Sequence, residues 1–378
     1  MIAVLLAVTA MYSIQGCIYG LSDSTIPQLL NRKETSLGAT EVLAIVHLPA
    51  ALKVFFAPLV DYGAQNIPGG YKNLMIALQG LVAAALLALI PLLPEALQKG
   101  RSGAEELRWP LFRVALLNAT GDLILDAFAL RQMPANRQHL PAVCQVIGIF
   151  VGTTVAKSGL FLLMKLEVLS VEGVVAGFVG FMAITALLAV LAVALAGKAD
   201  RNLAMVHFRD VLQGFWVFTT HRPNMAHWLL YQFFMPAVNF HHTVVLPSRY
   251  EQWGFQGEDY AAYDLPLALV TLSVLVVAST ATKDTKRQLS WVMMGYICEA
   301  LVVLGLVAQY CSWSGKPTAT FKFTYAVLNK LHDLLFFVCD MLEFAFMGQV
   351  ANLEPKLVAT LATIQLQSST FRTSFTPG

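Results

Sequence analysis

The sequence predicts an all-α membrane protein, a bundle of apolar helices arranged in two halves. Hydrophobic residues make up 57% of the 378 residues and charged residues only 13%, and the mean hydropathy is +0.63. Soluble domains carry about a quarter charged residues, so half the usual charge would have to cover a soluble surface. The apolar residues also fall into runs of about twenty, the length of helix that crosses a bilayer.

Ten apolar windows are long enough to cross a membrane. In chain order they lie near 2–21, 42–62, 74–94, 111–130, 141–164, 173–196, 225–246, 265–281, 290–311 and 325–348. The first window follows Met1 directly, without the basic segment of a signal peptide, which predicts a spanning helix. An eleventh window begins near 357 and stops at a polar segment. We therefore expect a twelve-helix architecture whose C-terminal half is incomplete.

A long polar segment in mid-chain divides these windows into two groups. We expect a six-helix N-terminal half at 1–197, a cytoplasmic linker at 198–222 and a C-terminal half at 223–378. Basic residues in the linker and in the loop 283–287 favour the cytoplasmic side, which places the N-terminus there too. Two six-helix halves form the major facilitator architecture, in which a site at mid-membrane opens alternately to each side.

Composition excludes several other classes of function. A net charge of +2, from 25 basic and 23 acidic residues, is too small for a nucleic-acid-binding surface. No GxxxxGK[ST] motif is present, so an ATP-driven pump is not expected. No cofactor or metal site is predicted, because the cysteines form no CxxC pair and lie in apolar stretches as packing residues. The five are Cys17, Cys144, Cys298, Cys311 and Cys339.

Ionisable residues at membrane depth are costly, and each is a functional candidate. Asp122 and Asp126 in the fourth span are four residues apart and share one helix face. Two close carboxylates in a low dielectric do not both ionise cheaply, which is the property of a proton-coupling site. The structural alternative is that both pair with basic residues and hold helices together.

Lys53 and Lys157 interrupt the second and fifth spans. Each must face a cavity or a carboxylate, and we expect Asp122 or Asp126 to be that partner. The alternative is that these lysines bind a negatively charged substrate.

The last predicted spans carry several acids. Glu299 lies in the ninth span and Asp333, Asp340 and Glu343 in the tenth, where they either line a polar cleft or pair structurally. His241-His242 end the seventh span and are expected at the membrane interface. Pro49 and Pro58 in the second span and Pro236 in the seventh should bend their helices.

Short motifs in the first two spans resemble the acetyl-coenzyme A transporter family of the major facilitator superfamily. That family has QG, GL and IP pairs in its first helix, and LK followed by APLVD in its second. The matching positions are Gln15-Gly16, Gly20-Leu21, Ile26-Pro27, Leu52-Lys53 and Ala57 to Asp61. The resemblance extends into the fourth span through Asp122, Ile124, Asp126 and Leu130, and into the fifth through Cys144, Gly148 and Leu160-Phe161. It is weaker near Asn352 to Pro355, where the family has an SDP-type turn.

The resemblance implies a secondary transporter, not an enzyme. It would move acetyl-coenzyme A from the cytosol into an endomembrane lumen, such as the endoplasmic reticulum, with exchange for coenzyme A as one mode. The expected substrate and translocation residues are Gln15, Lys53, Asp122, Asp126, Lys157, Asp340 and Glu343. A gating loop would use Asp61, Lys72 and Arg131. Aromatic walls for the solute would come from Phe55, Phe56, Phe161 and Tyr231.

Three alternatives stay open. The Asp-x-x-x-Asp helix also occurs in muropeptide permeases and folate–biopterin transporters, which makes a solute:proton symporter the runner-up. A transport-dead relative is the second alternative, because the C-terminal half is incomplete. An intramembrane aspartyl protease is the third and fits less well, since Ala-Thr-Gly precedes Asp122 in place of a GxGD element.

Overall fold

The computed structural model is an all-helical bundle. It describes residues 2–32, 38–196 apart from 135, 136, 138 and 168, a few positions between 208 and 216, and residues 257–279, 285–312 and 318–351. The predicted seventh span and the eleventh window, with Tyr231, Pro236, His241-His242 and Asn352 to Pro355, lie outside the described residues.

Each of the six predicted spans of the N-terminal half is helical. The first is α1 (Ile2–Gly20), η1 (Leu21–Thr25) and α2 (Ile26–Asn31), and the second is α3 (Gly38–Leu43), η2 (Ala44–His47), α4 (Leu48–Ala51) and α5 (Lys53–Asn66). The third is α6 (Gly70–Leu89), η3 (Ile90–Leu92) and α7 (Leu93–Ala96), and the fourth is α8 (Arg101–Gln132). The fifth is α9 (Leu140–Thr154), η5 (Val155–Gly159) and α10 (Leu160–Lys165), and the sixth is α11 (Val171–Ala196).

Three long helices follow in the described part of the C-terminal half. They are α15 (Gly257–Ala278), α16 (Thr285–Ser312) and α17 (Ala319–Ala351), which overlap the predicted eighth, ninth and tenth spans. Of the helices in the described ranges, five are long and apolar enough to cross a membrane, and a sixth counts if a bent pair in the second span is one crossing. In α16 the apolar stretch Met294–Gln309 is shorter, and Lys330, Asp333 and Asp340 interrupt the apolar residues of α17.

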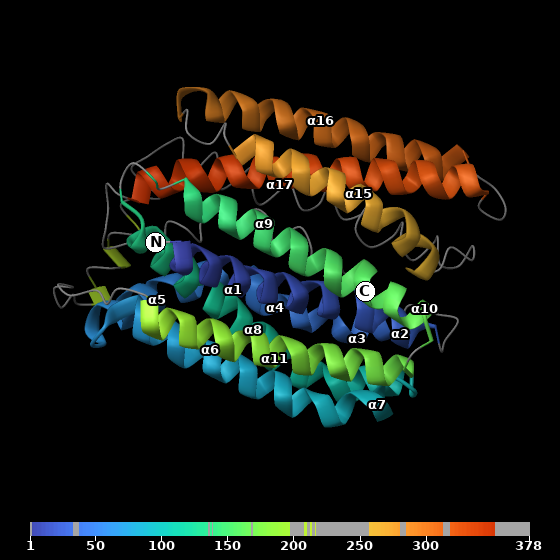
Figure 1. Ribbon diagram of the computed structural model, residues 1–378, viewed down its shortest axis with the longest axis horizontal. Helices are drawn as coiled ribbons and strands as arrows, with labels where there is room; N and C mark the ends of the chain where they lie inside the picture. The colour runs from blue at the N-terminus through green and yellow to red at the C-terminus, as the bar shows by residue number, and fades with distance from the viewer. Residues whose placement is uncertain are drawn as a thin grey trace.

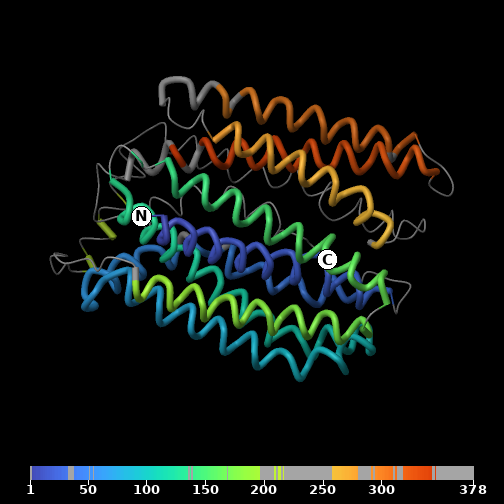
Figure 2. The backbone as a smooth tube through the Cα atoms, viewed as in Figure 1, coloured from blue at the N-terminus to red at the C-terminus, as the bar shows by residue number. Residues whose placement is uncertain are grey.

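The helices run along one common direction and form two groups. Figure 1 shows α5, α6, α8 and α11 on one side and α15, α16 and α17 on the other. The tube in Figure 2 shows α1 and α9 between these groups. Helix α9 packs on α1 and also on α15 and α17, so it forms the boundary between the halves.

Glycines allow α1 and α9 to approach closely. A Cβ atom at Gly16 would lie 2.3 Å from the Ile149 carbonyl oxygen, and one at Gly152 would lie 1.9 Å from the Ser13 carbonyl oxygen. Small residues four apart let membrane helices pack backbone to backbone. Gly16 and Gly20 on α1, facing Gly148 and Gly152 on α9, follow that spacing.

Two π-turns lie side by side where this close packing ends. Thr25, the last residue of η1, donates a hydrogen bond from Oγ1 to the carbonyl oxygen of Ala156 in η5 at 2.6 Å. A π-turn inserts an extra residue into the helix and often occurs at functional sites. The turn η5 contains two polar residues, Lys157 and Ser158.

The second span is bent by 46° between Gly38–Ala50 and Phe55–Asn66. The break follows Pro49, which confirms the predicted bend there, whereas Pro58 lies inside α5 without interrupting it. Lys53 is the first residue of α5, directly after the break. The bend therefore determines where this lysine enters the bundle.

Candidate functional site

A buried ion pair lies at the centre of the N-terminal half. The Lys53 ammonium contacts Asp122 Oδ2, and both residues are 1% exposed. With its amide oriented to satisfy both partners, Gln15 donates to Asp122 Oδ1 at 2.8 Å. The prediction that Lys53 meets a carboxylate of the fourth span is confirmed, and the partner is Asp122. Three helices, α1, α5 and α8, join at this pair.

Asp126, one turn further along α8, has different neighbours. The Tyr12 hydroxyl donates to its Oδ1 at 2.6 Å, and Gln145 Nε2 donates to the same oxygen at 3.1 Å. The second oxygen, Oδ2, has no hydrogen-bond partner among the described residues. The two acids that share a helix face thus differ in kind: Asp122 has a cation, whereas Asp126 has two neutral donors.

Lys157 is half-buried in η5 and lacks the partner expected from the sequence. Across the described ranges, no carboxylate oxygen lies within 4.0 Å of its ammonium. It is twelve residues beyond Gln145, which is about 18 Å along a helix axis, too far to reach Asp126. The acid with which Lys157 interacts electrostatically is Asp333 of α17, in the other half.

A second buried ion pair connects α15 and α17. Lys330 Nζ lies 2.8 Å from Asp264 Oδ1 and 3.1 Å from Asp333 Oδ2. The Ser158 hydroxyl, from η5, donates to Asp264 as well. The Lys330 ammonium also lies 5.2 Å from the centroid of the Phe150 ring in α9. This network therefore crosses from the C-terminal half into the N-terminal half at membrane depth.

The remaining acids of the last spans differ in their surroundings. Glu299 of α16 is buried, with Oε1 at 3.2 Å from His332 Nε2, so it holds α16 to α17. Asp340 is half-buried on α17, and the side chain of Glu343 lies outside the described residues. Of the acids predicted to line a polar cleft, Glu299 therefore makes a structural contact between two helices.

Asp264 escaped the sequence analysis. Asp264 lies one residue before the predicted eighth window, 265–281, but inside helix α15, which begins earlier, at Gly257. Had the window begun there, Lys330 would have been its predicted partner.

The three predicted gating residues gather at one end of the bundle around Tyr71. The Tyr71 hydroxyl donates to Asp61 Oδ1, and the Arg131 guanidinium carbon lies 5.0 Å from the Tyr71 ring centroid. Lys72 Nζ donates to the Ala194 carbonyl oxygen of α11 at 2.9 Å. All of these residues belong to the N-terminal half. Tyr71, which the sequence analysis did not single out, is the residue that connects Asp61 with Arg131.

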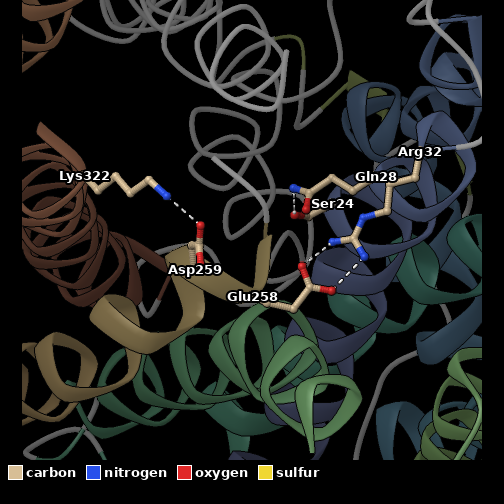
Figure 3. A network of polar contacts seen from close by, with 6 residues as sticks. All are labelled: Ser24, Gln28, Arg32, Glu258, Asp259 and Lys322. Carbon is tan, nitrogen blue, oxygen red and sulfur yellow. Dashed lines mark hydrogen bonds and ion pairs between the residues drawn. The ribbon is translucent and has the colours of Figure 1, made fainter. Parts of the chain in front are cut away.

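Two salt bridges lie at the opposite end, and one of them, Arg32–Glu258, connects the two halves (Figure 3). The Arg32 guanidinium binds Glu258 through two hydrogen bonds, each of 2.7 Å. Lys322 Nζ lies 2.6 Å from Asp259 Oδ2, which joins α17 to the start of α15. Arg32 directly follows α2, so the Arg32–Glu258 pair closes the boundary between the halves at this end.

Comparison with known proteins agrees with this architecture. Residues 3–171 match the model of a protein family described as Acetyl-coenzyme A transporter 1. The chain is similar in structure to the human organic anion transporter MFSD10 (TETRAN), with a TM-score of 0.62 and 11% identity, over 98% of this chain and 91% of that one.

Two further structures show the same fold. The proton:xylose symporter XylE of the major facilitator superfamily matches with a TM-score of 0.62 and 12% identity, over 98% of this chain and 86% of that one. The nucleoside transporter NupG matches with a TM-score of 0.60 and 13% identity, over 98% and 89%. At these identities the structures establish the fold, which is the predicted major facilitator bundle.

The family match covers the segment that contains the Lys53–Asp122 pair, Asp126, Lys157 and the gating residues. Its motifs at Gln15-Gly16 and Gly148 form the close packing of α1 on α9. The protein is thus a multi-pass membrane protein with the major facilitator fold, and its residues 3–171 are similar to the acetyl-coenzyme A transporter family.

Proposed function

We propose that this chain carries acetyl-coenzyme A from the cytosol into an endomembrane lumen, such as that of the endoplasmic reticulum, by alternating access. Exchange for coenzyme A is one mode of this transport, and coupling to protons is the other. The family match over residues 3–171 supports the solute, and the major facilitator fold supports the transport mechanism. The proposed substrate and translocation residues are Gln15, Lys53, Asp122, Asp126, Lys157, Asp340 and Glu343.

The observation that carries this proposal is the difference in ion pairing between the two lysines inside the spans, Lys53 and Lys157. Acetyl-coenzyme A carries several phosphate charges, and a cation must be available to bind them. Lys53 is already balanced by Asp122, so it would have to leave its carboxylate first. Lys157 has no carboxylate within 4.0 Å in the described part of the chain, and its turn packs on α15 of the other half. We assign Lys157 the contact with substrate phosphate.

Aromatic rings from both halves support the binding of an adenine ring. Phe150 of α9 and Phe337 of α17 meet edge to face, with ring centroids 5.3 Å apart. Phe336 packs on Phe337 at 5.2 Å. The wall predicted at Phe55 is wrong, because this side chain is 69% exposed on the outside of the bundle. The break before α5 turns Lys53 inward and leaves Phe55 on the opposite face.

The test is uptake of labelled acetyl-coenzyme A by vesicles reconstituted with the purified protein. We expect Lys157→Ala to lower the initial rate at least about tenfold, because a hydrogen bond to a charged group contributes about 1.5–3 kcal/mol. The matched control is Lys165→Ala, an exposed lysine at the end of the same span, which should keep the wild-type rate. Equal rates for wild type and Lys157→Ala would contradict the assignment.

A solute:proton symporter of the folate–biopterin or muropeptide type is the second candidate function. The observation that favours it is Asp126, a buried acid that lacks a cation of its own. Uptake of a labelled pterin or muropeptide, without uptake of acetyl-coenzyme A, would select this candidate. Absence of uptake for every solute would indicate a relative without transport activity.

A further inference from the structure

Asp126 is an ionisable group in a place where a charge is expensive. It lies in the C-terminal third of α8 with an exposed fraction of 0%. Its Oδ1 atom accepts two hydrogen bonds, and its Oδ2 atom has no hydrogen-bond partner among the described residues. Buried carboxylates in such surroundings are normally neutralised or paired with a cation.

Four side chains from four helices interact with Asp126. Tyr12 of α1 and Gln145 of α9 are neutral donors in direct contact. Asp122 of α8 and Lys53 of α5 act on it electrostatically at longer range. Lys53 is in direct contact with Asp122, which leaves the two neutral donors as the direct partners of Asp126.

The charges of this group balance only when Asp126 carries a proton. Lys53 and Asp122 together are neutral. An ionised Asp126 would leave one net negative charge, with two neutral hydrogen bonds to stabilise it, in a site closed to solvent. A protonated Asp126 leaves the site neutral, and a neutral site can pass between the two membrane-facing states without burying a charge.

We propose that Asp126 is the proton-binding residue of this transporter and couples solute movement to proton movement. A proton from the water on one side forms the O–H bond at Oδ2 when the transporter is open to that side. The same bond breaks when the transporter opens to the other side, and the proton passes to water there. The coupling rests on the proposed transport function, whereas the protonation of Asp126 in the closed state does not.

The first experiment measures protonation without any solute. Infrared spectra of the purified protein at neutral pH should contain the C=O stretch of a protonated carboxyl group that is absent from Asp126→Asn. Glu105→Gln, which removes an exposed acid from the same helix, should leave this band unchanged. A spectrum of Asp126→Asn identical to that of wild type would overturn the proposal, because Asp126 would then be ionised.

The second experiment measures coupling. Vesicles that contain a pH-sensitive dye receive acetyl-coenzyme A, and we expect wild type to move protons together with the solute. Asp126→Asn should lose the proton movement, and Asp126→Glu should restore part of it. Solute uptake by wild type without proton movement would overturn the coupling but leave the proposed solute intact. If wild type takes up no acetyl-coenzyme A, the proposed function is overturned. The infrared result would still decide whether Asp126 is protonated.

Discussion

Asp122 and Asp126, two acids on one helix face, have neighbours of different charge. The Lys53 ammonium and the Gln15 amide serve Asp122, whereas Asp126 has the Tyr12 hydroxyl and the Gln145 amide. Opposite charges in a buried site stabilise each other only while both are present, since each one alone pays the full cost of leaving water. Removing one partner of the Lys53–Asp122 pair should therefore destabilise the N-terminal half, apart from any role of the pair in the proposed translocation site.

This argument predicts a specific pattern of stability. Lys53→Ala should destabilise the purified protein by about 3–5 kcal/mol, because it leaves Asp122 as a buried charge without its partner. The double variant Lys53→Met with Asp122→Leu should recover most of that loss, since it removes both charges and keeps the volume. Thermal unfolding in detergent measures both. A double variant less stable than Lys53→Ala would show that the pair is not the source of the effect.

At the scale of elements, the decisive contact is that of α1 on α9. Backbone atoms of the two helices meet at Gly16 and Gly152, where no side chain separates them. The adjoining π-turns are joined by the Thr25 hydrogen bond to Ala156. This close packing holds η5, and with it Lys157 and Ser158, at the boundary between the halves. The glycines thus position Lys157, to which we assign the substrate contact, and Ser158, one or two turns away.

Substitution of these glycines should show the importance of this packing. Gly152→Val places new atoms where the Ser13 carbonyl oxygen already lies, 1.9 Å from a Cβ, so α1 and α9 must separate. We expect a strong loss of folded protein, measured as the monodisperse fraction in size-exclusion chromatography. Gly177→Ala is the control, because a Cβ on that residue of α11 meets open space. This alanine should stabilise the protein by up to about 1 kcal/mol through helix propensity.

At the scale of the whole molecule, the two halves meet along α9 and are closed at one end by Arg32 and Glu258. An exposed pair of this kind contributes only about 0.2–1 kcal/mol. That amount matters little for folding. We expect it to matter for the proposed transport, because it would shift the balance between a state closed at this end and a state open at this end by up to about fivefold.

A charge exchange tests this role. Arg32→Glu places two like charges at the closed end, so it should change the rate of acetyl-coenzyme A uptake by about two- to fivefold. The swapped variant, Arg32→Glu with Glu258→Arg, should return the rate toward that of wild type. The melting temperature should stay within a few degrees in both variants, since the pair is exposed. A swap that fails to restore the rate would show that the pair does not control closure.

The sequence by itself determined the order of the described helices, the bend after Pro49 and which ionisable residues interrupt the apolar runs. Bilayer thickness sets the length of an apolar run, and proline removes a backbone donor, so both features are local. Motifs near Gln15 and Asp61 also indicated the resemblance to the acetyl-coenzyme A transporter family. Only the tertiary structure decided that Lys53 binds Asp122 and not Asp126, and that Lys157 interacts electrostatically with Asp333. Partners such as Ser158 and Asp264 are 106 residues apart, and whether they meet depends on how each helix is rotated and shifted against its neighbours, which is a property of packing that no local pattern contains.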